Sequence, residues 1–163
     1  MSIFNALIKL RNQVSTLLAY SYQKTEWIPA IPKDIQSLRE FMGSKYRWKS
    51  DPLFGLLDHI QPIKHMNYSL KHKGFIDGDC DDLATYTLWL AWAMGADTAV
   101  RINMPNVQHV IGAFLVSDGW CVCSNCDLMG PYLNFAKTQA KIVEVFGGDA
   151  LKCAVFEHLT EIS

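Results

Sequence analysis

The segment from Cys80 to Met94 constrains the fold most, because it has the pattern of a helix and is apolar on nearly every side. It reads CDDLATYTLWLAWAM and is followed by Gly95, a typical residue at a helix end. A helix that is apolar nearly all round has to lie in the centre of its domain. The chain has 163 residues, which is long enough for one domain with a core that covers such a helix.

The residues before this helix are predicted to be mostly helical. Apolar residues in the first 20 positions recur near helical spacing and predict an amphipathic helix, with a membrane-surface helix as the alternative. Asp34 or Ser37 can cap a short second helix, and Asp51-Pro52 has the cap-then-proline pattern of a third helix start. Two further segments before Cys80 are expected to be loops, namely 43–50 and 61–75.

Beyond Gly95 the pattern changes from helices to strands. Ser117-Asp118-Gly119 joins two of the predicted strands as a tight hairpin, and Asn134 caps a further helix that ends at Phe146. The predicted strands are 98–104, 109–116, 120–125 and 151–159. Helices followed by a mainly antiparallel sheet define the α+β class.

Composition argues against several classes of function. The formal net charge is −1, which gives no argument for nucleic acid binding, and no segment has the ~20 uninterrupted apolar residues of a membrane span. The basic stretches 44–50 and 69–74 are read as solvated loops, with a phosphate-binding patch as the alternative. The five cysteines are an odd number, and we read no export signal, so a reduced cytoplasmic setting fits better than a disulfide framework.

Cys80 lies in the first turn of the central helix, in the sequence IDGDCDDLA with four aspartates. The free N–H groups and partial positive charge of a helix N-terminus stabilise a thiolate and can also bind an oxyanion. Asp79 and Asp82 suit structural roles as caps in this turn. Because their charges oppose a thiolate, Cys80 needs a cationic partner, and a histidine is the usual one.

His109 is the histidine best placed to be that partner, because it begins a strand that is otherwise apolar. Alternation puts His109, Ile111, Ala113 and Leu115 on one face of the sheet. Folding the hairpin about Asp118 brings Asn125 and Asp127 to this face. Either side chain could orient the imidazole by accepting its N–H.

The segments GDCDDLATYTLWLAWAMG, QHVIGAFLV and GWCVCSNCD resemble the transglutaminase-like cysteine protease superfamily, which has bacterial and phage members. The resemblance covers about residues 74–130. It implies a papain-like α+β fold in which a central buried nucleophile helix packs on a mainly antiparallel sheet. It also implies a Cys-His-Asp/Asn site at Cys80 and His109. Ser124 stands where many relatives carry aspartate, so we place Asn125 first as the orienting residue and Asp127 second.

The sequence thus predicts a single transglutaminase-like domain over 1–163, with a helical part at 1–60. We expect a cysteine hydrolase or acyltransferase that acts on a protein or peptide through a thioester, without a cofactor. Release by water would make it a protease or amidase, and release by an amine a transamidase. The alternative is a non-catalytic adaptor or virion protein, for example one associated with phage, that retains the fold.

Two metal sites are weighed against this prediction. Asp77, Asp79 and Asp81 begin like a calcium loop, but Asp82 stands where that loop needs glycine and Leu88 where it needs glutamate. A zinc-bound interaction module is the other alternative, with ligands from Cys121, Cys123, Cys126 and His109. We favour neither and expect no bound metal.

Overall fold

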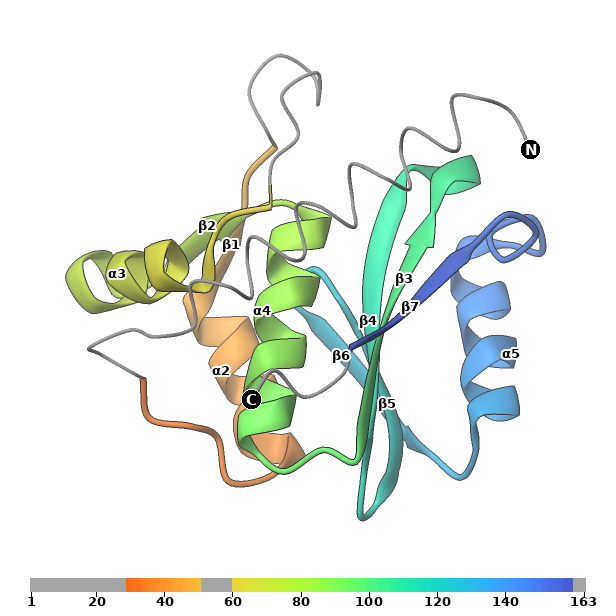
Figure 1. Ribbon diagram of the computed structural model, residues 1–163, viewed down its shortest axis with the longest axis horizontal. Coiled ribbons are helices and arrows are strands. Elements are labelled where there is room, and N and C mark those ends of the chain that lie inside the picture. The colour runs from red at the N-terminus through yellow and green to blue at the C-terminus, as the bar shows by residue number, and fades with distance from the viewer. Residues whose placement is uncertain (1–28, 51–59, 160–163) are drawn as a thin grey trace.

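The computed structural model describes residues 29–50 and 60–159, and a five-stranded antiparallel sheet lies at its centre (Figure 1). The strand order is β6-β5-β4-β3-β7. The strands are β3 (Thr98–Met104), β4 (His109–Val116), β5 (Gly119–Ser124), β6 (Asp127–Tyr132) and β7 (Val155–Leu159). The predicted α+β class and the antiparallel sheet are confirmed.

Helices cover both faces of this sheet, α4 on one face and α5 on the other (Figure 1). The helices are α2 (Ile35–Lys45), α3 (Ile63–Lys73), α4 (Cys80–Ala93) and α5 (Phe135–Phe146), with a short 3-10 turn, η1 (Pro105–Val107), before β4. A small parallel pair, β1 (Tyr46–Trp48) and β2 (Ile76–Gly78), lies on the α4 side.

The helix α4 is buried between the sheet and the smaller elements, as its composition predicts. Leu83, Leu88 and Leu90 are fully buried in one cluster with side chains of α2, α3 and the sheet. A Cβ atom at Gly112 of β4 would lie 2.9 Å from Leu88, so the absence of a side chain there allows α4 to approach the strand closely. This contact sets the distance between α4 and the sheet.

Two caps form largely as predicted. Asp34 is the N-cap of α2, and its capping box is completed by Ser37. Asn134 is the N-cap of α5, where its side chain accepts a hydrogen bond from the backbone of Lys137.

Two segments that we expected to be loops are ordered elements. The segment 61–75 contains α3, in which Ile63, Met66 and Leu70 recur at helical spacing and are buried. The segment 43–50 contains the end of α2 and all of β1. β6 has no counterpart in the predicted strands, because its Gly130 and Pro131 weaken the strand pattern. The helices predicted at the N-terminus and after Asp51 lie outside the described residues.

Candidate active site

Cys80 is the first residue of α4, at the point where β2 leads into the helix. A Cβ atom at Gly78 would lie 2.6 Å from the Cβ of Asp82, so β2 can pass the first turn only with glycine at this position. Cys80 is half-buried. The Gly-Asp-Cys sequence therefore places a partly accessible thiol at a helix N-terminus, as predicted from the sequence.

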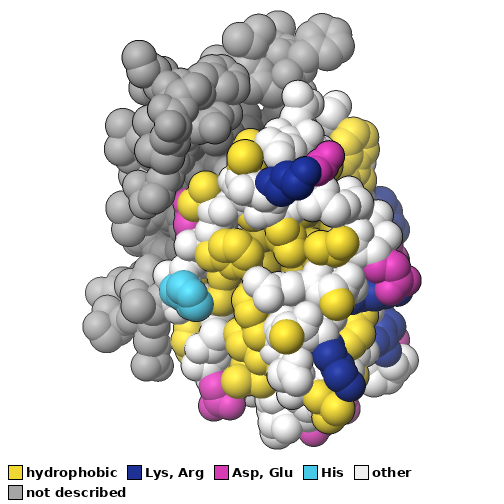
Figure 2. Space-filling model, turned by 90° about the vertical axis from the view of Figure 1, so that its right-hand side faces the viewer, with side chains coloured by type: hydrophobic (Ala, Val, Ile, Leu, Met, Phe, Trp, Pro, Cys, Tyr) yellow, Lys and Arg dark blue, Asp and Glu magenta, His cyan; other side chains and the backbone are white. Residues whose placement is uncertain are grey.

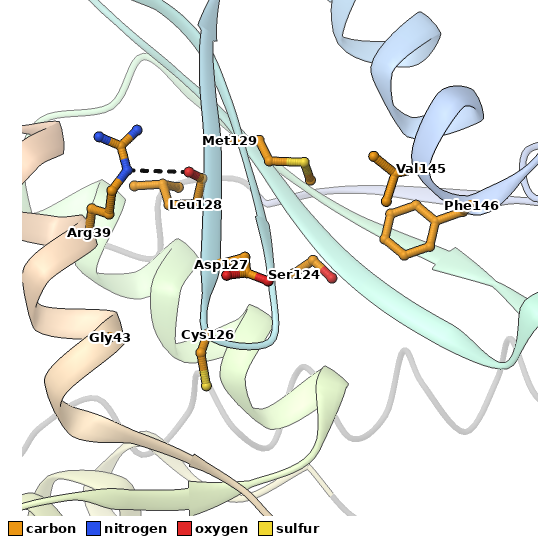
Figure 3. A pocket seen from close by; sticks show the side chains of 9 residues that line it. All are labelled: Arg39, Gly43, Ser124, Cys126, Asp127, Leu128, Met129, Val145 and Phe146. Atoms are coloured by element: carbon orange, nitrogen blue, oxygen red, sulfur yellow. Dashed lines mark hydrogen bonds between the residues drawn. The ribbon is translucent and has the colours of Figure 1, made fainter.

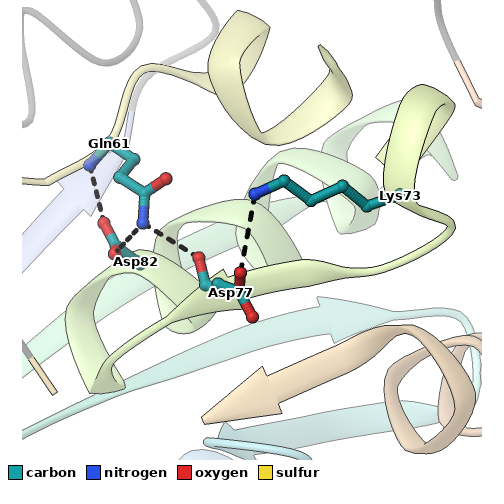
Figure 4. Close-up of polar contacts among 4 residues, drawn as sticks. All are labelled: Gln61, Lys73, Asp77 and Asp82. Carbon is teal, nitrogen blue, oxygen red and sulfur yellow. Dashed lines mark hydrogen bonds and ion pairs between the residues drawn. The ribbon is translucent and has the colours of Figure 1, made fainter. Parts of the chain in front are cut away.

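The two aspartates predicted to support this turn behave differently. Asp79 is the N-cap residue of α4, but its side chain makes no capping hydrogen bond, which corrects the expectation of an aspartate cap. Asp82 is fully buried and accepts hydrogen bonds from the backbone N and the side-chain Nε2 of Gln61, at 2.6 and 2.7 Å (Figure 4). Gln61 Nε2 also donates to the carbonyl oxygen of Asp77. Asp82 thus joins the first turn of α4 to the segment before α3.

His109 is the first residue of β4, and its side chain lies on the face of the sheet that α5 covers. Its ring is 5.1 Å from the ring of Phe146, between centroids, and Ile111 and Ala113 of the same face are packed with Ile142 of α5. The predicted alternation of β4 is confirmed. His109 Nε2 lies 2.9 Å from the hydroxyl oxygen of Ser124 at the end of β5. Ser124 is therefore the hydrogen-bond partner that the structure gives to this ring.

The predicted register of the hairpin was wrong by one residue. Val116 pairs with Gly119 and Gly112 with Cys123, so the hairpin turns around the bond between Ser117 and Asp118 and not around Asp118 itself. A shift of one residue moves every side chain of a strand to the other face. The shift brings Ser124 to His109 in place of Asn125.

Asn125 and Asp127 have other positions. Asn125 lies in the turn after β5 with φ of 51°, and its buried Oδ1 has no hydrogen-bond partner among the described residues. Asp127 is exposed at the start of β6. The sequence did contain a signal for Ser124, since it stands at the position where many members of the superfamily that the sequence resembles carry aspartate.

The pKa of His109 is lowered from its ordinary value of 6.5 because burial disfavours the imidazolium, and the carboxylate of Asp79 opposes this shift. Asp79 therefore lies close enough for its charge to act on the ring. The beginnings of α4 and β4 lie at the same end of the sheet (Figure 1). This end gathers the turn of Cys80, the carboxylate of Asp79 and the His109–Ser124 pair.

The other cysteines occupy different environments. Burial raises the pKa of Cys121 to about 11 and that of Cys123 to about 12, and it also raises the pKa of Cys126. These three thiols stay protonated near neutral pH, and none is in a disulfide. Cys153 is an exposed free thiol.

Neither proposed metal set is assembled in the described part of the chain. Within residues 29–50 and 60–159, three or more potential ligands gather only at Asp79, Asp81 and Asp82, with ligand atoms within 4.8 Å of one another. That group omits Asp77 of the calcium loop and all the cysteines of the zinc set. Both oxygens of Asp82 already accept hydrogen bonds from Gln61.

A pocket of about 590 Å³ opens beside the His109–Ser124 pair, between α2, the β5–β6 hairpin and the end of α5 (Figure 3). It is lined by both Ser124 and Phe146, which contact the His109 ring. The rest of the lining is Arg39, Gly43, Cys126, Asp127, Leu128, Met129 and Val145.

Comparison of the chain with protein-family models, with curated proteins and with solved structures finds no match. Among the helices of the described residues, none combines the length and apolar character needed to cross a membrane. The fold and site describe an α+β protein with a half-buried cysteine at the N-terminus of its central helix and a hydrogen-bonded histidine at the same end of the sheet.

Proposed function

We propose that this chain is a cysteine-dependent enzyme that acts on an amide or thioester carbonyl. Cys80 is the nucleophile, His109 is the general base and acid, and Ser124 takes the orienting role expected of Asn125 or Asp127. The observation that carries the proposal is the 2.9 Å contact between His109 Nε2 and Ser124, at the end of the sheet where Cys80 opens α4. The papain-like, transglutaminase-like fold is part of the same proposal.

The hydrogen bond to Ser124 supports a defined role for each nitrogen of the ring. If Nε2–H donates to the serine hydroxyl, Nδ1 is the unprotonated nitrogen and can accept the proton of the Cys80 thiol. The lowered pKa of His109 keeps the ring neutral at pH 7, as a base requires. The charge of Asp79 stabilises the imidazolium that forms after proton transfer, a task that the neutral Ser124 hydroxyl performs less well.

The proposed reaction follows from these roles. The Cys80 sulfur attacks the carbonyl carbon, and the free N–H groups of the first turn of α4 stabilise the oxyanion. His109 donates its proton to the leaving amine, which gives a thioester on Cys80. Attack by water completes a hydrolysis, and attack by a second amine completes a transamidation.

Mapping of cysteine alkylation by mass spectrometry, with limiting iodoacetamide near neutral pH, tests the nucleophile. Cys80 should react faster than the exposed Cys153, which serves as the internal standard, and much faster than Cys121 or Cys123, whose pKa values burial raises to about 11 and about 12. His109→Ala should slow only the reaction of Cys80. If Cys80 reacts no faster than Cys153, it is not an activated nucleophile.

The second candidate is a non-catalytic protein that retains the fold, as an adaptor or virion component would. The observation that favours it is the serine at position 124, because a hydroxyl carries no charge to hold an imidazolium. For such a protein, the reaction of Cys80 should be insensitive to His109→Ala. The alkylation experiment therefore separates the two candidates.

A further inference from the structure

We propose that the pocket beside His109 binds an apolar side chain of the substrate, on the residue that supplies the leaving amine. This inference rests on the proposed function, and it names the substrate class as peptides with an aliphatic residue directly after the scissile bond. The occupant is one side chain with its adjoining backbone, for which the volume of about 590 Å³ leaves ample room.

The position of the pocket assigns it to the leaving side of the reaction. The pocket is lined by Ser124 and Phe146, which contact the His109 ring, whereas Cys80 is not among its lining residues. In the tetrahedral intermediate the acyl carbon is bonded to the Cys80 sulfur, and the amine nitrogen faces the histidine that protonates it. A group in the pocket is therefore attached to that nitrogen.

The lining favours an aliphatic side chain. An apolar wall is formed by Met129, Val145 and Phe146 on the α5 side of the β5–β6 hairpin, and Leu128 lies on the side that faces α2 (Figure 3). The guanidinium of Arg39 is occupied, since it donates to the carbonyl oxygens of Leu128 and Gly130 at 3.4 and 3.3 Å and to the Gln36 side chain. It is thus a poor partner for an acidic substrate. The other charged residue of the lining is the exposed Asp127, whose carboxylate attracts the protonated amine that leaves.

The wall of the pocket continues onto the surface of α5. Val145, which lines the pocket, is 48% exposed. The space-filling view of the side that carries α5 shows hydrophobic side chains gathered over a broad area (Figure 2). An apolar wall that opens onto such a surface can receive a side chain of an extended peptide from solvent.

The chemical step needs no further reactant. The bond between the Cys80 sulfur and the acyl carbon forms, the bond from that carbon to the amine nitrogen breaks, and the proton taken by His109 from the thiol passes to the nitrogen. The aliphatic residue then leaves the pocket as part of a free amine. That amine is a product, so it should bind the pocket even when no reaction occurs.

Binding of leucinamide to the full-length Cys80→Ala variant tests the inference without any turnover. Leucinamide should bind at least about tenfold more tightly than glycinamide in an NMR titration, because several methylene groups enter an apolar site. Val145→Arg should abolish this preference. Val143→Arg is the matched control, since it places the same group on the same helix outside the lining, and it should retain the preference.

The outcomes separate the two proposals. Absence of a leucinamide preference, or equal effects of Val145→Arg and Val143→Arg, overturns the pocket assignment even if Cys80 alkylates rapidly in the wild-type chain. Slow alkylation of Cys80 overturns the proposed function, and the leaving-side role of the pocket falls with it. Both arginine variants replace exposed side chains, so unchanged thermal unfolding should confirm that they fold.

Discussion

Replacing Gln61 with alanine should destabilise the protein, because this side chain links the segment before α3 to the first turn of α4. Its Nε2 donates to the buried Asp82 carboxylate at 2.7 Å and to the carbonyl oxygen of Asp77 at 2.9 Å. A hydrogen bond to a charged group contributes about 1.5–3 kcal/mol and an ordinary one about 0.5–1.5 kcal/mol. The backbone bond from Gln61 N to Asp82 remains in the variant. We expect the free energy of unfolding to fall by about 2–4 kcal/mol.

For a chain of this size, each kcal/mol lost lowers Tm by about 2–4 °C, so Gln61→Ala should melt roughly 5–15 °C earlier. Urea unfolding followed by tryptophan fluorescence gives the free energy, and circular dichroism gives Tm. Gln36→Ala is the matched control, because Gln36 makes its hydrogen bonds to Glu40 and Arg39 on the exposed surface of α2. Gln36→Ala should lower the free energy of unfolding by less than about 0.5 kcal/mol.

Equal effects of the two substitutions would refute the argument that the hydrogen bonds from Gln61 to Asp82 stabilise the fold.

The effect of calcium on Tm gives a second check on the same turn. Because Gln61 already occupies both oxygens of Asp82, added calcium should leave Tm unchanged. A calcium-dependent rise in Tm that Asp79→Ala abolishes would show that these aspartates hold a metal and not the turn.

Three further predictions follow from the site and the core. Ser124→Ala should reduce turnover more than Asn125→Ala or Asp127→Ala in a peptide cleavage assay, because Ser124 is hydrogen-bonded to the His109 ring. A greater loss with Asn125→Ala would support the register expected from the sequence. Since burial lowers the pKa of His109 below 6.5, the unfolded chain binds more protons than the native one between the folded pKa and 6.5. Urea unfolding should therefore show stability falling as the pH drops through this window, and less so in His109→Asn. Gly112→Ala should lower the free energy of unfolding by about 1–3 kcal/mol in the same assay, because the added Cβ would lie 2.6 Å from the sulfur of Cys123 in β5 and 2.9 Å from Leu88 of α4. An unchanged midpoint would contradict the close contact of α4 with β4.

The sequence alone determined the features that depend on short-range pattern. The apolar composition of 80–94 identified the buried helix α4, and the alternation after His109 identified β4 and the face that the histidine shares with Ile111 and Ala113. The capping residue Asn134 located the start of α5. These features follow from the preferences of residues within a few positions of one another, so no knowledge of the tertiary structure was needed.

Only the tertiary structure decided which side chains meet. The partner of His109 depends on the register of the β4–β5 hairpin, because a shift of one residue brings Asn125 to the ring in place of Ser124. The alternation of hydrophobic residues in the two strands did not distinguish these two registers. The donor to Asp82 is 21 positions away, at Gln61, and no local pattern indicates it. The pocket needs α2, the β5–β6 hairpin and α5 together, so it exists only once packing has placed three distant segments around Ser124.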